Sequence, residues 1–218
     1  MTAKNAAYAG RIKYTEDRSR KYQQRKPAKH TAEMRLLERA FALIPKTHRV
    51  LDAPCGGGRV SIYLSGLGYQ VSAADLSEAM IKIAREKFAQ KGLSVAVEQQ
   101  DVEKLTYSDR HFDTLVSFRL FHHFPDQDIR RRVVNELCRV AGKNVVLSYF
   151  SPISFTSMRN KFAAAIGGKK SKKYSTPLSE VERYFKANGF RLRKDFAQLP
   201  LVHTLHVAVF ERAGKSKP

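Results

Sequence analysis

Apolar residues follow two patterns that alternate along the chain. In the first pattern they form short runs or occupy every second position, and in the second they recur every three to four residues. The first spacing is typical of strands and the second of amphipathic helices. Strands are predicted at 49–55, 69–75, 93–101, 111–120, 143–150, 190–196 and 201–212. Helices are predicted from Thr31 to Ile44 and over 59–68, 77–92, 125–142 and 177–189, with Ser77 as a cap and Pro177 in a first helical position.

Strand and helix alternate from residue 30 onward, which predicts a mainly parallel sheet with helices on both faces. The connection between the last two strands is too short for a crossover helix, so that pair is expected to be antiparallel. The fold class is therefore α/β, a doubly wound, mainly parallel seven-stranded sheet with an antiparallel C-terminal strand. Its domain is expected to span 30–212, after a basic arm at 1–29 and before a tail at 213–218.

Three consecutive glycines, Gly56 to Gly58, separate the first predicted strand from the following helix. Glycines at such a turn let the backbone approach a ligand closely, and the helix N-terminus adds exposed N–H groups. Asp75 closes the second strand, where an acid can hold the two hydroxyls of a ribose. Ile62 stands where a dinucleotide fingerprint might place its last glycine, and Asp52 would repel a pyrophosphate. A cationic nucleoside fits better, and the alternative is that Asp52 and Asp75 cap the turn and the next helix, a role that Asp75 can combine with ligand binding.

Four segments in order, VLDAPCGGG, SAADLSEAM, QQDVEKL and FDTLVSFRLFHHFPD, resemble the signature segments of the class I S-adenosylmethionine-dependent methyltransferases. The likeness is strongest to the small-molecule enzymes of ubiquinone and menaquinone biosynthesis. It covers about residues 30–150, and the C-terminal strand pair matches in pattern only. Pro54 departs from the family pattern, which usually has glycine at that place.

The resemblance implies an enzyme that uses S-adenosyl-L-methionine and assigns roles to individual residues. Asp52 would orient the turn near the methionine amino group, and Asp75 would hold the ribose hydroxyls. The other implied donor-binding residues are Cys55, Gly56 and Gly58 by their backbone, Leu76 against the adenine, Asp101 at the adenine amino group with Val102 beside it, and Ser117, Phe118 and Arg119 after the fourth strand.

The remaining chemistry-bearing residues give weaker signals. His122 and His123 follow the fourth strand, and either is a candidate base for deprotonating the acceptor. The favoured interpretation is that one of them is packed and the other solvated. Asp101 can equally be a solvated loop acid, and Cys55 a small buried filler. No metal cluster is expected.

The charge is unusual, because 40 Lys and Arg against 20 Asp and Glu give a formal net charge of +20. The basic residues gather in the N-terminal arm and in a basic insert at 151–175, which includes the Lys169–Lys173 run. Such clusters attract anionic partners. The insert is therefore expected to form a lid over a small or lipid-linked anionic acceptor. Two other interpretations remain, an RNA methyltransferase that binds phosphates through these clusters and a non-catalytic basic binding module.

The hydrophobic content of 43% is that of a globular domain, and no apolar run approaches the roughly 20 residues that a membrane span needs. The N-terminus lacks a secretory pattern, and the two cysteines lie in different predicted elements. A cytoplasmic protein is expected, and its basic charge also suits the inner surface of a membrane.

Overall fold

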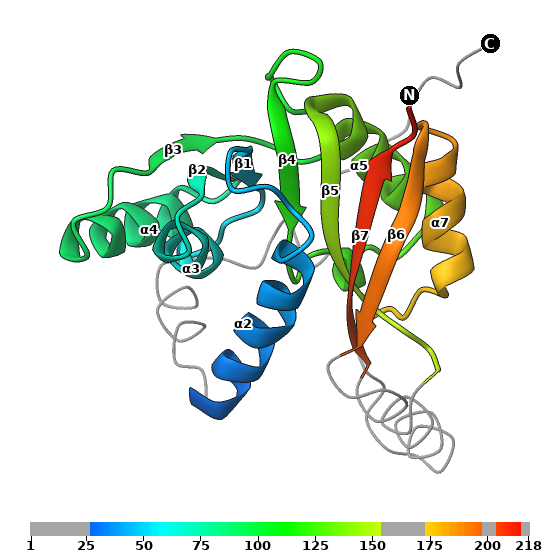
Figure 1. The fold of residues 1–218 in the computed structure, drawn as a ribbon, viewed down its shortest axis with the longest axis horizontal. Coiled ribbons are helices and arrows are strands. Elements are labelled where there is room, and N and C mark those ends of the chain that lie inside the picture. The colour runs from blue at the N-terminus through cyan, green and yellow to red at the C-terminus, as the bar shows by residue number, and fades with distance from the viewer. Residues whose placement is uncertain (1–26, 154–172, 198–203, 215–218) are drawn as a thin grey trace.

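A seven-stranded sheet with the order β3-β2-β1-β4-β5-β7-β6 forms the centre of the computed structural model, which describes residues 27–153, 173–197 and 204–214 (Figure 1). The strands are β1 (Arg49–Asp52), β2 (Gln70–Asp75), β3 (Ala96–Gln99), β4 (Phe112–Ser117), β5 (Ala141–Phe150), β6 (Phe190–Ala197) and β7 (Leu205–Arg212). Neighbouring strands from β3 to β5 are parallel, and β7 pairs antiparallel with both β5 and β6. The predicted fold class is confirmed.

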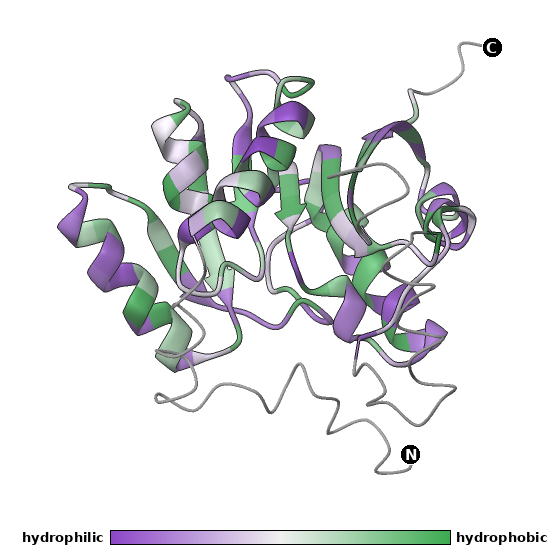
Figure 2. Ribbon diagram, turned by 90° about the horizontal axis from the view of Figure 1, so that it is seen from below, coloured by the Kyte–Doolittle hydropathy of each residue, from purple (hydrophilic) through white to green (hydrophobic). Residues whose placement is uncertain are grey.

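Helices cover both faces of this sheet. They are α2 (Pro27–Phe41), α3 (Arg59–Gly66), α4 (Glu78–Gln90), α5 (Gln127–Val140) and α7 (Leu178–Lys186), with the short 3-10 helix η1 (Phe121–His123) after β4. The apolar side of α2 packs with α3 and with strand residues such as Val116 and Val207. Helices α5 and α7 enclose the opposite face, where Leu115 and Phe210 are fully buried. Figure 2 shows both hydrophobic and hydrophilic segments along the helices, as expected when one side of each packs on a sheet.

Local sequence signals account for the ends of several helices. The Ser77 hydroxyl accepts from the Met80 N–H (3.4 Å), which confirms the predicted cap of α4. The predicted start of α2 at Thr31 is wrong, because the helix begins at Pro27, whose fixed φ suits a first turn. Thr31 lies inside the helix and its hydroxyl donates to the Pro27 carbonyl (3.1 Å). Pro177 immediately precedes α7 and does not lie in its first helical position.

Two stretches to which the sequence analysis gave a role lie outside the described residues. They are the arm up to residue 26, and the greater part of the basic insert with its lysine run. Lys173 is the one member of that run within the described ranges. Among the described helices, none combines the length and the apolar composition that crossing a membrane requires.

Candidate functional site

The carboxyl end of β2 meets the glycine turn that follows β1. The Asp75 carboxylate accepts the Gly56 N–H (2.8 Å) with one oxygen and the Ser77 N–H (2.9 Å) with the other. Burial raises the pKa of Asp75, whose side chain is only slightly exposed. A carboxylate offers about four acceptor positions, so contacts with the Gly56, Ser77 and Leu76 N–H groups still leave acceptor capacity for a hydroxyl donor. Asp75 therefore fixes the turn and can still accept from a diol.

Gly56 and Gly58 need glycine for different reasons. Both have positive φ, 53° at Gly56 and 77° at Gly58. A Cβ on Gly58 would lie 2.6 Å from the Phe88 ring of α4, so helix packing requires its absence. A Cβ on Gly56 would meet nothing within 4 Å. The open space beside Gly56 is where the backbone can approach a ligand.

Asp52 ends β1 and is fully buried. One of its oxygens accepts the Ser61 N–H (3.0 Å) and the Ser61 hydroxyl (2.6 Å), which satisfies an N–H in the first turn of α3. Within the described ranges its other oxygen, Oδ1, has no hydrogen-bond partner. Burial, countered in part by the Ser61 contacts, raises the pKa of Asp52 to about 7. A cationic group beside Oδ1 would favour the charged carboxylate.

The end of β4 turns sharply at Arg119, which has a φ of 67°. This left-handed conformation is uncommon for a residue with a side chain and is often found at functional sites. The Arg119 N–H donates to the Ser148 hydroxyl at the end of the neighbouring β5 (2.6 Å). Ser117 and Phe118, just before it, are buried, and Ser117 Oγ has no hydrogen-bond partner in the described part of the chain.

Arg119 also joins an ion cluster that the sequence analysis did not foresee. The buried Glu33 carboxylate of α2 lies 2.8 Å from an Arg59 nitrogen and 3.6 Å from an Arg119 nitrogen. The three residues come from segments far apart in the sequence, which explains why no local motif indicated them. We refer to Glu33, Arg59 and Arg119 as the arginine cluster.

The residues predicted to lie beside the adenine differ from one another in exposure and contacts. Leu76 directly follows β2 and is 39% exposed, so its side chain is accessible to a ligand at the carboxyl end of that strand. The Asp101 carboxylate accepts the Glu103 N–H (3.0 Å) and so stabilises its own turn. Val102 packs into the hydrophobic core, so its contribution to a ligand site would come from its backbone. Cys55 is buried and its thiol pKa is raised by burial, which suits the interpretation as a filler.

His122 and His123 lie in η1, close to the end of β5. His122 is 1% exposed and its ring stacks on Phe150 at a centroid distance of 4.0 Å. His123 is half-buried, and its ring centroid lies 4.2 Å from that of His122. His122 is thus packed within the protein, whereas His123 has more contact with solvent, and neither arrangement assigns a catalytic role.

A second polar group at the same edge of the sheet went unnoticed in the sequence. His206 Nδ1 lies 2.7 Å from Asp195 Oδ2, and the Tyr149 hydroxyl donates to the same oxygen (3.1 Å). The side chains of His206 and Asp195 are 15% and 18% exposed. Burial, together with the nearby Asp195 carboxylate, raises the pKa of Tyr149. Because the three residues belong to three different strands, only the strand register brings them together.

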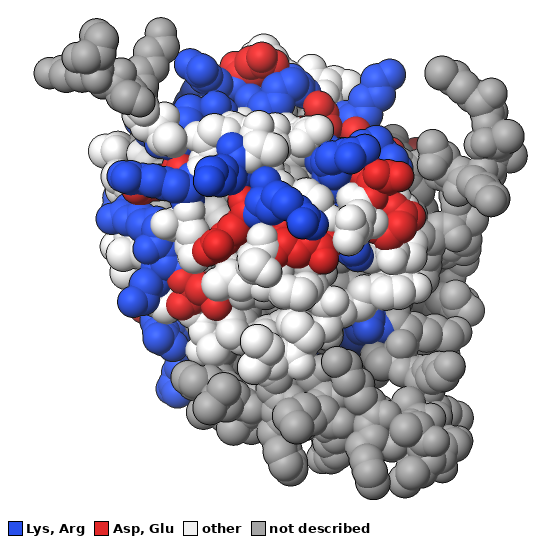
Figure 3. All heavy atoms as spheres, turned by 90° about the vertical axis from the view of Figure 1, so that its right-hand side faces the viewer, with Lys and Arg blue, Asp and Glu red and all other residues white. Residues whose placement is uncertain are grey.

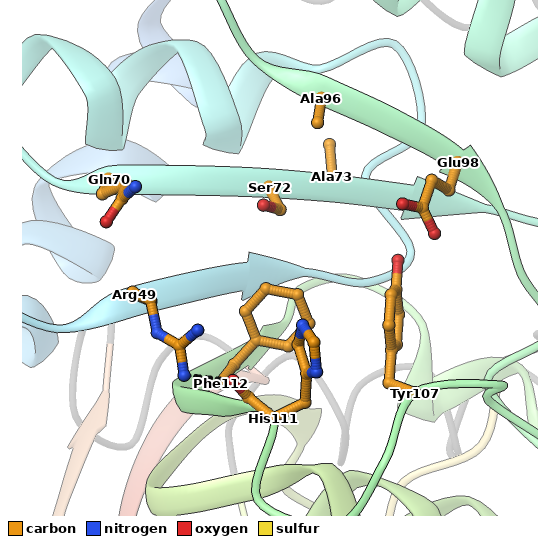
Figure 4. Close-up of a pocket in the computed structure, with 9 residues that line it drawn as sticks. All are labelled: Arg49, Gln70, Ser72, Ala73, Ala96, Glu98, Tyr107, His111 and Phe112. Carbon is orange, nitrogen blue, oxygen red and sulfur yellow. Dashed lines mark hydrogen bonds between the residues drawn. The ribbon is translucent and has the colours of Figure 1, made fainter.

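A cavity of about 220 Å³ opens elsewhere, over the face of β2 between Arg49 and Tyr107 (Figure 4). No helix spans the connection from β3 to β4, so residues of that connection cover the sheet there. Figure 4 shows the Tyr107 hydroxyl pointing toward Glu98, while Arg49 donates to the His111 carbonyl. Several of its lining residues begin their strands, so the cavity lies away from the glycine turn and the carboxyl ends of β1 and β4.

Across the described residues, no group of three or more His, Cys, Asp or Glu side chains is placed to hold a metal ion.

Known proteins resemble this chain in sequence and in fold. Residues 50–144 match the family described as a methyltransferase domain. A ubiquinone biosynthesis O-methyltransferase of Coxiella burnetii is 28% identical over 152 residues, which are 67% of this chain and 65% of that protein. One of Xanthomonas euvesicatoria is 36% identical over 96 residues, 44% of this chain and 40% of the relative. The matched region thus spans less than two thirds of the length of these relatives.

A solved structure has the same fold. The magnesium protoporphyrin IX methyltransferase of Synechocystis with bound SAH superposes with a TM-score of 0.73 and 19% identity, and the match covers 87% of this chain and 89% of that one.

Proposed function

Because this chain belongs to the class I S-adenosylmethionine-dependent methyltransferases, we propose that it methylates a small or lipid-linked acceptor that carries an anionic group. The observation that carries the donor assignment is the pairing of Asp75 with the glycine turn, which leaves acceptor capacity beside open space at Gly56. Asp52 Oδ1 and Ser117 Oγ, both buried and without a partner among the described residues, add polar atoms at the same edge. These residues fit a cationic nucleoside.

Each of these residues has a task that follows from its surroundings. Asp75 would accept the ribose hydroxyls, and Leu76 would cover the base. Asp52 would hold the amino group of the methionine part through its second oxygen, which shifts Asp52 toward its charged form. The bound donor supplies an already activated methyl group, so the protein mainly has to place the acceptor in line and accept its proton.

The charge of the protein supports an anionic acceptor. The chain has a formal net charge of +20, and the face seen in Figure 3 shows many Lys and Arg side chains with acids between them. Interspersed charges of this kind also keep a protein soluble, so surface charge alone does not select the acceptor. The relatives named as ubiquinone biosynthesis O-methyltransferases favour a small lipid-linked molecule over RNA, and an O-linked product.

The test is incubation of the protein with labelled S-adenosylmethionine and a fractionated cell extract. We expect label in the lipid or small-molecule fraction, with little change in rate as salt is raised. Label in RNA, with an affinity that falls steeply with salt, would establish the RNA alternative. A protein that binds no S-adenosylhomocysteine and shows no donor-dependent stabilisation would be a binding module without turnover.

A further inference from the structure

The cavity shown in Figure 4 lies on the face of β2 that is turned away from α3 and α4. Val71 and Ala73 of this strand pack with residues of those two helices. Gln70 and Ser72 alternate with them along the strand, so their side chains line the cavity on the other face. The connection from β3 to β4 forms the opposite wall and leaves a space of about 220 Å³.

The strand side of this cavity is polar. Ser72 is half-buried and Gln70 is exposed, and neither side chain has a hydrogen-bond partner in the described part of the chain. A hydroxyl and a primary amide both donate and accept hydrogen bonds. This side of the cavity therefore suits a ligand whose edge carries donors and acceptors together.

The opposite wall is aromatic and is held in place. The ring centroids lie 5.5 Å apart for Tyr107 and His111, 5.1 Å for Tyr107 and Phe112, and 4.7 Å for His111 and Phe112. Arg49 donates to the His111 carbonyl (2.5 Å). Arg139 donates to the Tyr107 carbonyl (2.7 Å), so the backbone of the wall is fixed as well. Rings held in this way offer a face on which a flat aromatic ligand can stack.

Opposite charges line the two ends of the cavity. Burial, together with the Glu98 carboxylate toward which its hydroxyl points, raises the pKa of Tyr107, so the phenol stays protonated. Glu98 accepts from Gln100 Nε2 at 3.4 Å, and a carboxylate offers about four acceptor positions, so capacity for a ligand N–H is left. At the other end, the Arg49 guanidinium lies 3.8 Å from Asp113. A neutral ligand can meet both ends without adding net charge.

We infer that this cavity binds a single nitrogen-containing aromatic ring that bears an amino group, which is the chemistry of an aminated nucleobase such as cytosine. The aromatic wall stacks on the ring, and Glu98 accepts an amino N–H. Ser72 and Gln70 pair with the ring nitrogens and the carbonyl oxygen.

The size and the place of the cavity limit the inference. Its volume of about 220 Å³ is below the roughly 300–1,000 Å³ of pockets that hold drug-sized ligands, which restricts the enclosed part of the ligand to a small ring. None of the residues that line it belongs to the proposed donor-binding set. The inference therefore goes beyond the proposed function and can fail independently of it.

The experiment compares cytidine with pyrimidin-2-one riboside, which is cytidine without its amino group, in titrations followed by NMR. Saturating S-adenosylhomocysteine keeps the donor site occupied. The variants are Glu98→Ala, which removes the acceptor of the amino group, and Ala96→Phe, which places a ring in the cavity from the exposed first residue of β3. Glu86→Ala is the matched control, because it removes an exposed acid from α4. Thermal unfolding shows whether each variant is folded.

Wild type should bind cytidine at least tenfold more tightly than the analogue. Glu98→Ala should weaken cytidine to the level of the analogue and leave the analogue unchanged, because only the amino group contacts Glu98. Ala96→Phe should weaken both at least tenfold, and Glu86→Ala neither.

Tetracytidylate identifies the source of the ring. Binding that is tighter than that of cytidine and weakens with salt supports a base of single-stranded nucleic acid. Binding equal to that of cytidine supports a free nucleoside.

Three results would overturn the inference: no binding of cytidine by wild type, equal affinity for cytidine and the analogue, or wild-type affinity in a folded Ala96→Phe protein. Displacement of cytidine by S-adenosylhomocysteine would also overturn it, because the ring would then lie in the donor site. Should Ala96→Phe unfold, the comparison of the two ribosides in Glu98→Ala still decides. Failure of wild type to bind S-adenosylhomocysteine would refute the proposed donor and leave the cavity test intact.

Discussion

The β1–β4 half of the sheet and the β5–β7 half place their polar side chains in different ways. In the first half, a carboxylate at the end of a strand contacts the start of the following helix, as Asp52 does with Ser61 in the first turn of α3. In the second half, the Tyr149, Asp195 and His206 group depends on three strands aligned by an antiparallel register. Local contacts leave a signature in the sequence, whereas contacts made through register do not.

The arginine cluster contains both residues beside local motifs and a residue that a long-range contact brings in. Arg59 and Arg119 lie beside recognisable motifs, yet their shared partner Glu33 is on a helix that precedes the sheet. Short motifs can therefore place the two arginines, whereas the carboxylate that pairs with both comes from a distant segment. If the two halves are energetically independent, a substitution in the β5–β7 half should leave donor binding at the β1–β4 half unchanged.

The largest effect is expected for Asp75→Ala in the first half. Loss of its hydrogen bonds to ribose, each about 1.5–3 kcal/mol for a charged acceptor, should weaken S-adenosylhomocysteine binding by about a hundredfold or more. Calorimetry measures this affinity. Asp75→Asn is the second variant, because asparagine has a similar shape without the charge. Asp113→Ala is the control, since that acid lies near the start of β4 and accepts the Arg49 N–H. Wild-type affinity in both Asp75 variants would show that the ribose is bound elsewhere.

Gly58→Ala and Gly56→Ala separate folding from binding within the same turn. At Gly58 the new methyl group meets Phe88 and the φ is unfavourable, so unfolding free energy should fall by about 3 kcal/mol. At Gly56 only the φ is unfavourable, so the loss should be about 1–2 kcal/mol, while donor affinity drops. Urea unfolding and calorimetry test both, and adding Phe88→Leu should partly rescue Gly58→Ala. Equal stability losses would contradict the packing role of Gly58.

Asp52 should make donor binding depend on pH. With a pKa near 7, the free protein increasingly carries a neutral Asp52 below that pH, so affinity for a cationic amino group should fall by up to about tenfold per pH unit. Asp52→Asn should bind more weakly at pH 8 and with a flatter pH profile. An equally steep profile in the variant would assign the dependence to another group.

The raised pKa of Asp52 also predicts how the stability of the ligand-free protein depends on pH. Because burial raises the folded-state pKa above its ordinary value of 3.8, the folded protein holds this proton more tightly than the unfolded chain. The stabilisation of the folded state by this proton is complete below about pH 4 and is lost as pH rises through 7. The melting temperature of Asp52→Asn should therefore exceed that of wild type by more at pH 8.5 than at pH 5.5. The opposite trend would contradict the raised pKa.

The smallest effect is expected in the second half. His206→Leu should lower the unfolding free energy by about 1 kcal/mol, because a leucine side chain cannot make the partly buried hydrogen bond to Asp195. S-adenosylhomocysteine binding should not change, since the group lies outside the proposed donor residues. Urea unfolding and calorimetry measure the two quantities. A clear loss of donor affinity would mean that the two halves are coupled.

The sequence was sufficient for the strand order along the chain, the antiparallel pair and the helix cap at Ser77, because each depends on spacing or on a local contact. It placed Asp52 and Asp75 at strand ends beside the glycine turn, where the structure has them. It could not reveal the partner of Arg119, the packing role of Gly58, or the His206 group. These depend on which distant segments meet, and a residue type alone does not encode that.

The two native cysteines offer a built-in reporter of motion. Cys55 lies in the glycine turn and Cys138 in α5, both buried with thiol pKa values raised by burial. A thiol-alkylating reagent can therefore reach each sulfur only after its own surroundings open. Mass spectrometry of the two peptides over time would thus give separate opening rates for the glycine turn and for the helical layer behind β4 and β5, without any label being engineered into the chain.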